Sequence, residues 1–128
     1  MSRETRRTRQ ERGRSAQSLG VRAEQRAVEA LRASGWEILG QRLRTPAGEI
    51  DLVAEREGLL AIIEVKSRPA LSEAAYALGP RQQARLAAAA ALLLAAHPGW
   101  GAGGVRFDVL LVDSEGRVRR IADAFRPG

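Results

Sequence analysis

Two strand-like segments separated by a tight turn constrain the fold of this chain more than any other feature. Residues 48–53 alternate polar and apolar side chains, residues 59–65 are mostly apolar, and residues 57–58 are Glu-Gly. Alternation with a period of two is typical of a β-strand, and a two-residue connection joins antiparallel strands. We therefore expect a β-hairpin in which Arg56 pairs with Leu59.

The register of this hairpin would place four charged side chains on one face. Counting outward from the turn puts Asp51 opposite Glu64, and Glu49 opposite Lys66. Directly opposed β-carbons lie about 4.5 to 5.5 Å apart, and like charges at that separation destabilise a sheet. A divalent cation would compensate, because magnesium is typically held by one or two carboxylates and several waters. The alternatives are a solvated Glu49–Lys66 ion pair beside two exposed acids, or a one-residue register slip that separates the set.

Lys66 is the only lysine among the 21 basic residues of the chain. It ends the strand-like segment 62–66, two residues after Glu64. An ammonium group is a compact point charge that a planar guanidinium does not replace well. An arginine-rich chain that keeps one lysine beside an acid therefore indicates a site that needs such a charge. The alternative is a charged residue that simply ends a strand.

A predicted helix upstream of the hairpin adds a third acid. Ser18 can act as its N-cap, residues 19–33 have helical spacing, and Gly35 ends it. Glu24 begins a series at the i, i+3, i+4 and i+7 positions of one helix face, continued by Ala27, Val28 and Leu31. This spacing predicts that Glu24 faces the core side, where it would serve as a metal or water ligand. A glutamate that reaches solvent from a helix end is the alternative.

The remaining segments complete an alternating order of elements. We expect a first strand at residues 36–39, a helix from Pro80 to about His97, a strand at 105–113 and, after a turn, a strand at 118–121. The core stripe of the second helix is predicted to be Leu86, Ala89, Ala90 and Leu93. The resulting order is helix, three strands, helix, strand and a terminal extension.

Composition excludes several classes of site. A chain of 128 residues fits one domain, and the absence of cysteine together with a single histidine excludes disulfides and thiolate or histidine zinc sites. The apolar run at residues 86–96 is about half of the roughly 20 residues needed to cross a bilayer. No apolar leader follows the arginine-rich start. We expect a cytoplasmic protein with no membrane partner.

The first 17 residues hold most of the excess positive charge. They contain six arginines and two glutamates, and so account for four of the net charge of +6. Between Met1 and Ala16 there is no apolar side chain, so this segment cannot bury a face. We expect a disordered arginine-rich arm at residues 1–17, able to contact phosphates, and a single domain at residues 18–128.

Several short blocks resemble a known family. Asp51, the triplet Glu64-Val65-Lys66 and an upstream helical Glu24 resemble the active site of the PD-(D/E)XK nucleases. The blocks that narrow the match are Gly20–Glu24, Gly48–Leu52, Glu64–Arg68, Arg106–Val109 and Ala124–Phe125. In this order and spacing, they resemble the bacterial YraN-like family over residues 18–125. The resemblance implies an α/β restriction-endonuclease-like fold, with a mixed central sheet flanked by helices, related to archaeal Holliday-junction resolvases.

The resemblance also implies roles for the charged residues. Asp51, Glu64 and the Val65 carbonyl would hold Mg²⁺ or Mn²⁺. Glu24 would assist through the metal or a water, and Lys66 would orient or deprotonate the attacking water. These four side chains form the predicted catalytic set.

Other positions extend or depart from the family pattern. Arg68 and Gln83 are the predicted nucleic-acid contacts. The alternatives are a solvated arginine at position 68 and a solvent-facing polar residue near a helix N-terminus at position 83. Where the family often has lysine, this chain has Gln82, and Arg42 and Asp123 stand where asparagine is common. The loss of that lysine would weaken a phosphate contact.

The function expected from these patterns is metal-dependent hydrolysis of phosphodiester bonds. DNA is favoured over RNA as the partner, with branched or junction DNA as the implied substrate, and a homodimer would supply the two active sites that paired cuts require. The alternatives are a noncatalytic nucleic-acid-binding module with an unused active site and a structural interaction protein, because a fold alone does not choose among them.

Overall fold

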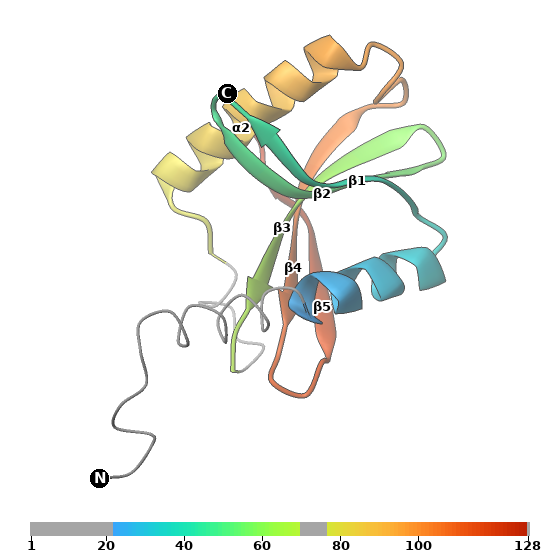
Figure 1. The fold of residues 1–128 in the computed structure, drawn as a ribbon, viewed down its shortest axis with the longest axis vertical. Coiled ribbons are helices and arrows are strands. Elements are labelled where there is room, and N and C mark those ends of the chain that lie inside the picture. Colours follow the sequence, from blue (N-terminus) through green and yellow to red (C-terminus); the bar gives the residue numbers. More distant parts are fainter. Residues whose placement is uncertain (1–21, 70–76, 128) are drawn as a thin grey trace, which may run out of the picture.

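A computed structural model describes residues 22–69 and 77–127 as a sheet with a helix on each face (Figure 1). The described chain begins in a helix over residues 22–33 and continues through β1 (Glu37–Thr45), β2 (Gly48–Arg56), β3 (Leu59–Ser67), α2 (Pro80–Ala96), β4 (Val105–Val112) and β5 (Val118–Phe125). The strands lie in the order β1-β2-β3-β4-β5. β3 and β4 are parallel because α2 connects them, and the other neighbouring strands are antiparallel. The predicted α/β, restriction-endonuclease-like fold is confirmed.

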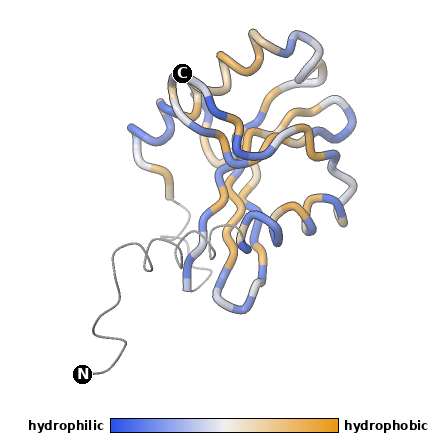
Figure 2. The backbone as a smooth tube through the Cα atoms, viewed as in Figure 1, coloured by the Kyte–Doolittle hydropathy of each residue, from blue (hydrophilic) through white to orange (hydrophobic). Residues whose placement is uncertain are grey.

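Each helix packs an apolar stripe against its own face of the sheet. The helix over residues 22–33 contributes Ala27, Val28 and Leu31 to one core, as the spacing predicts. α2 contributes Leu86, Ala89, Ala90 and Leu93 to the other core, which is the predicted stripe. Figure 2 shows these apolar stretches along both helices and the central strands. Full burial of a leucine or isoleucine side chain contributes about 1.5–3 kcal/mol, so these two cores fix both helices to the sheet.

The predicted β2–β3 hairpin is present with the predicted register. Glu57 and Gly58 have φ angles of 52° and 83°, and two successive positive φ values are the mark of the type I′ turn that favours hairpins. The antiparallel pairing runs from Arg56 and Leu59 outward to Leu52 and Ile63. The register slip weighed above is therefore excluded.

Along strand β2, the regular alternation of side chains between the two faces of the sheet is interrupted at Asp51. Pairing with β3 ends at Leu52 and Ile63, one pair before Asp51. Ile50 is buried in the α2 core, whereas Leu52, two residues later, is buried in the opposite core. Regular alternation would put both on one face. The irregularity at Asp51 lets its side chain leave the sheet at the point where β2 and β3 separate.

Both edge strands contain a non-glycine residue with positive φ. Arg42 in β1 has φ of 50°, and Asp123 in β5 has φ of 54°. The pairing of each edge strand with its neighbour also shifts register once. Asparagine and aspartate tolerate this left-handed conformation better than arginine does. This explains in physical terms why asparagine suits both positions.

Both edge strands are longer than expected, and some predictions fall outside the described residues. β1 extends to Thr45 instead of ending at residue 39, because as an edge strand it exposes polar residues that mask its strand character. β5 continues to Phe125, beyond the expected 118–121. The predicted arm at residues 1–17 and the Ser18 N-cap lie outside the described residues.

Neither helix in the described part of the chain has the length and apolar character of a membrane span. α2 is the more apolar of the two, and its 17 residues bury one stripe against the sheet.

Candidate functional site

Asp51 and Glu64 come from neighbouring strands where these strands separate. Asp51 Oδ2 accepts a hydrogen bond from the backbone N–H of Val65, with the two atoms 2.8 Å apart. The side-chain amide of Gln82, in the first turn of α2, donates to Glu64 Oε1 at 3.4 Å. One donor therefore holds each carboxylate: a residue of β3 holds Asp51, and a residue of α2 holds Glu64. The expected grouping of the two acids is present.

The environment of the two acids disfavours their charged forms. Burial, followed by the nearby Glu24 and Glu49, raises the pKa of Asp51 against the opposing hydrogen bond from Val65. Burial and the charge of Asp51 raise the pKa of Glu64 from 4.5 to about 7. A cation between the two carboxylates would remove this repulsion and favour ionisation of both.

The oxygen atoms at this point fit a hard divalent cation. Because the N–H and C=O of an extended residue point to the same side of a strand, the Val65 carbonyl faces the side on which Asp51 lies. Among residues 22–69 and 77–127, no group of three or more His, Cys, Asp or Glu side chains is placed to hold a metal. Two carboxylates and one carbonyl, completed by water, match the sparse coordination that magnesium accepts and do not match zinc.

Lys66 is buried and held by the chain that leads into α2. The residue is 9% exposed, and its Nζ donates to the Ala77 carbonyl at 2.8 Å. Burial, followed by the charge of Arg68, lowers the pKa of Lys66, and Glu64 opposes this change. The expected pairing of Lys66 with Glu49 is wrong, because the ladder ends before it. Glu49 instead lies opposite Arg44, with 3.8 Å between their charged groups.

Glu24 reaches the same region from the opposite helix. Its side chain is 16% exposed and binds the Arg42 Nε at 2.7 Å. This hydrogen bond raises the pKa of Arg42. Glu24 is also near enough to raise the pKa of Asp51, so the third acid approaches this one member of the pair. It does so as a partner of Arg42, which balances its charge.

Two participants that the sequence patterns do not predict lie on α2. Gln82 was interpreted as a departure from a family pattern, yet its amide donates to Glu64. Arg85, three residues later, lowers the pKa of both Asp51 and Glu64 through its charge. Residues three apart on a helix are neighbours on its surface, so this spacing was the available signal.

Comparison with known proteins places this arrangement in a family. The model of the uncharacterised protein family UPF0102 matches residues 23–112, about 70% of the chain. The chain belongs to the UPF0102 family. This is the YraN-like family that the sequence blocks indicate, so that prediction is confirmed. The matched segment contains every residue of the candidate site.

Relatives of this UPF0102 chain match over most of their own length. A UPF0102 protein of Granulibacter bethesdensis is 64% identical over 115 residues, covering 90% of this chain and 73% of the relative. A UPF0102 protein of Parvibaculum lavamentivorans is 50% identical over 115 residues, covering 90% and 86%. One of Bradyrhizobium diazoefficiens is 48% identical over 106 residues, covering 83% and 80%.

The two predicted nucleic-acid contacts of this UPF0102 protein have different surroundings. Arg68 is exposed, and its guanidinium donates to the Ser67 carbonyl. The Gln83 amide donates to the Leu78 carbonyl at 2.8 Å and so fixes the entry into α2. Arg68 is free to reach a ligand, whereas Gln83 has a structural contact. Their roles in nucleic-acid binding stay predictions.

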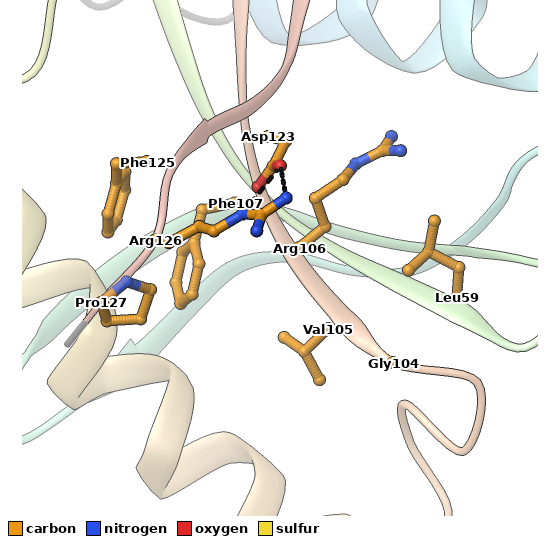
Figure 3. Close-up of a pocket in the computed structure, with 9 residues that line it drawn as sticks. All are labelled: Leu59, Gly104, Val105, Arg106, Phe107, Asp123, Phe125, Arg126 and Pro127. Atoms are coloured by element: carbon orange, nitrogen blue, oxygen red, sulfur yellow. Dashed lines mark hydrogen bonds and ion pairs between the residues drawn. The ribbon is translucent and has the colours of Figure 1, made fainter.

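A pocket of about 380 Å³ lies away from the acids (Figure 3). It is lined by Leu59, Gly104, Val105, Arg106, Phe107, Asp123, Phe125, Arg126 and Pro127. Leu59 and Val105 begin their strands, whereas Glu64 and Lys66 lie near the end of β3. The pocket therefore opens at the other end of the central strands, and its one drawn ion pair joins Arg126 to Asp123. The candidate site is therefore the place where β2 and β3 separate, and this pocket is not part of it.

Proposed function

We propose that this UPF0102 protein is a divalent-metal-dependent nuclease that hydrolyses phosphodiester bonds. The observation that carries the proposal is the meeting of Asp51 and Glu64 where β2 and β3 separate, with Lys66 two residues farther along β3. Two mutually repelling carboxylates beside a buried ammonium suit a cation and a phosphate oxygen. DNA is the favoured substrate, and branched or junction DNA is the specific class implied by the family resemblance.

The residues of the site would divide the chemistry among them. Asp51, Glu64 and the Val65 carbonyl would hold Mg²⁺ or Mn²⁺, which would supply Lewis-acid charge and lower the pKa of a bound water. The Val65 N–H keeps one Asp51 oxygen in place, and Gln82 orients Glu64. These two contacts hold both carboxylates ready for a cation.

Lys66 would act on the attacking water. In the reaction a water oxygen bonds to phosphorus, the bond from phosphorus to the leaving sugar oxygen breaks, and that oxygen takes a proton from solvent. Lys66 orients the water as an ammonium group or accepts its proton as a neutral amine. Burial lowers the pKa of Lys66 and so favours the neutral form needed for the second role.

One observation favours a noncatalytic nucleic-acid-binding module as the second candidate. The charged groups of Lys66 and Glu24 both have partners within the protein, because Lys66 donates to the Ala77 carbonyl and Glu24 binds Arg42. A binding module would keep these contacts and would not need a metal. In a nuclease, Lys66 would use its remaining N–H donors for water or phosphate, because an ammonium group has three.

The deciding experiment measures binding and cleavage together. Labelled single-stranded, duplex, flap and four-way-junction DNA and a matched RNA are incubated with Mg²⁺, Mn²⁺ or EDTA. The proteins are the wild type, Asp51→Asn and Lys66→Ala, with Glu29→Gln as an acidic control on the exposed surface of the first helix. Metal-dependent cutting that both site variants lose and Glu29→Gln keeps supports the nuclease. Binding of the same substrates without cutting by any protein supports the binding module.

A further inference from the structure

Arg85 projects from α2 over the start of β2. A β-carbon added to Gly48 would lie 2.9 Å from both Cγ and Cδ of Arg85, and Gly48 has φ of 142°. The missing side chain at Gly48 therefore makes room for the aliphatic part of Arg85. Thr45 fixes the preceding turn by accepting hydrogen bonds from the N–H groups of Ala47 and Gly48. The stem of Arg85 is seated against a defined piece of backbone.

The charge of Arg85 affects the pKa values of Asp51 and Glu64, although Arg85 forms no ion pair with either carboxylate. It opposes the raised pKa values of Asp51 and Glu64, so the guanidinium lies within electrostatic reach of both. Ion pairs at 2.7 to 2.8 Å bind Arg42 to Glu24, Arg106 to Asp108 and Arg117 to Asp113. Arg85 is exposed, and no ion pair or hydrogen bond joins its side chain to another described residue. Its donors stay available beside the site.

We infer that Arg85 binds a nonbridging phosphate oxygen of a nucleic-acid strand next to the carboxylate pair. The inference rests on the proposed function, because it assumes that the ligand of the site is a nucleic acid. A guanidinium offers paired N–H donors that match a phosphate, and it is less strongly hydrated than an ammonium. Gln82 faces the same region from the first turn of α2, which contains no acidic residue, so this end of the helix also favours an anion.

This contact would position the nucleic-acid backbone relative to Asp51 and Glu64. Arg85 belongs to α2 and Lys66 to β3, so a nucleic-acid strand at the carboxylates would meet positive charge from two different elements. Arg85 is thus a substrate-binding residue whose loss weakens binding in the absence of metal. That property separates its role from those of Asp51 and Glu64.

The test measures binding without a metal. Fluorescence anisotropy with labelled duplex and four-way-junction DNA is recorded over a series of NaCl concentrations in EDTA, for wild type, Arg85→Ala and Arg85→Lys. Arg32→Ala is the control, since Arg32 is also an exposed helical arginine but lies at the far end of the first helix from Glu24. Arg85→Ala should raise Kd by about five- to tenfold and reduce the salt slope by about one unit. Arg85→Lys should keep the slope and recover only part of the affinity.

Each outcome bears on the inference separately from the nuclease proposal. An unchanged Kd and salt slope in Arg85→Ala would overturn the inference even where the wild type cuts DNA. Failure of the wild type to bind either DNA would overturn it as well. A wild type that binds through Arg85 but cuts nothing in Mg²⁺ or Mn²⁺ would support the phosphate contact and contradict the nuclease. Thermal melts of all four proteins verify that the differences arise in folded protein.

Discussion

The backbone N–H of Val65 donates to Asp51 Oδ2 across the gap in which β2 and β3 stop pairing. This one contact replaces the ladder hydrogen bond that a regular hairpin would make there. It also orients the carboxylate, so that its second oxygen is the one free to meet a ligand. The candidate site therefore begins where the hydrogen-bonded ladder between β2 and β3 ends.

Asp51→Asn should separate the charge of this residue from its structural contact. The asparagine oxygen can still accept the Val65 N–H, so the free energy of unfolding should change little. Loss of a metal-binding charge should lower cleavage by roughly 100-fold or more. Asp51→Ala should lose the same activity and also about 1–2 kcal/mol of stability, since it leaves the Val65 N–H without its acceptor. Equal stability of the two variants in urea unfolding would contradict this account.

Glu64 should make the metal-free protein less stable as pH rises. Its pKa in the folded state is about 7 instead of 4.5, so the folded protein binds more protons between these values. Stability that is present below pH 4.5 is therefore lost as pH rises toward about 7. Glu64→Gln should remove this loss and be on the order of 1–2 kcal/mol more stable than wild type at about pH 8, after allowance for solvent screening.

Urea unfolding in EDTA at about pH 4 and about pH 8 measures this difference. Glu29→Gln, at an exposed position on the first helix, is the control and should follow the wild type at both values. A Glu64→Gln variant with the same pH dependence as wild type would show that Glu64 titrates normally.

Replacement of Lys66 should affect stability as well as cleavage. Lys66→Ala leaves the Ala77 carbonyl without its donor and should cost about 1–3 kcal/mol. Lys66→Arg keeps a positive charge, but the planar guanidinium must fit where the residue is only 9% exposed. We expect Lys66→Arg to bind DNA like the wild type in anisotropy and to lose most cleavage. Full activity of Lys66→Arg would show that any cation suffices.

The Glu24–Arg42 pair should have a small but measurable coupling. The two charged groups are 2.7 Å apart, but Arg42 is half exposed, so a double-mutant cycle of Glu24→Gln and Arg42→Asn should give a coupling free energy well below that of a buried ion pair. Arg42→Asn alone should be less destabilising than Arg42→Ala, because asparagine tolerates the positive φ of 50° better. Thermal unfolding of the five proteins tests both expectations. Additive effects of the two cycle mutations would show that the ion pair contributes nothing.

Local patterns were sufficient to predict much of the fold. The Glu57-Gly58 turn fixed the hairpin register because both residues adopt positive φ, and a two-residue turn leaves one pairing. The stripe of α2, which begins at Leu86, followed from helical spacing. Counting along a regular ladder failed beyond Leu52, because the strands separate there and Asp51 turns to the backbone of Val65.

The missing parts of the candidate site depend on contacts between distant elements. Arg85 is one of many arginines in the sequence, and only the packing of α2 over Gly48 distinguishes it. The contact of Lys66 with the Ala77 carbonyl also cannot be predicted from the sequence. Every residue has a backbone carbonyl, so no residue type marks this acceptor. Glu24 could be assigned to the core side, but its partner Arg42 lies in the part of β1 that was not recognised as a strand.

The positive φ angles of Arg42 and Asp123 also bear on how copies of this protein can meet. An edge strand with an uninterrupted row of N–H and C=O groups is a template for another strand. Here β1 and β5 are each interrupted, and the Asp123 N–H is already donated to the buried Asp108. A neighbouring chain would have to straighten these residues before it could extend the sheet. The bends at the two margins therefore protect the protein against growth into a continuous intermolecular sheet.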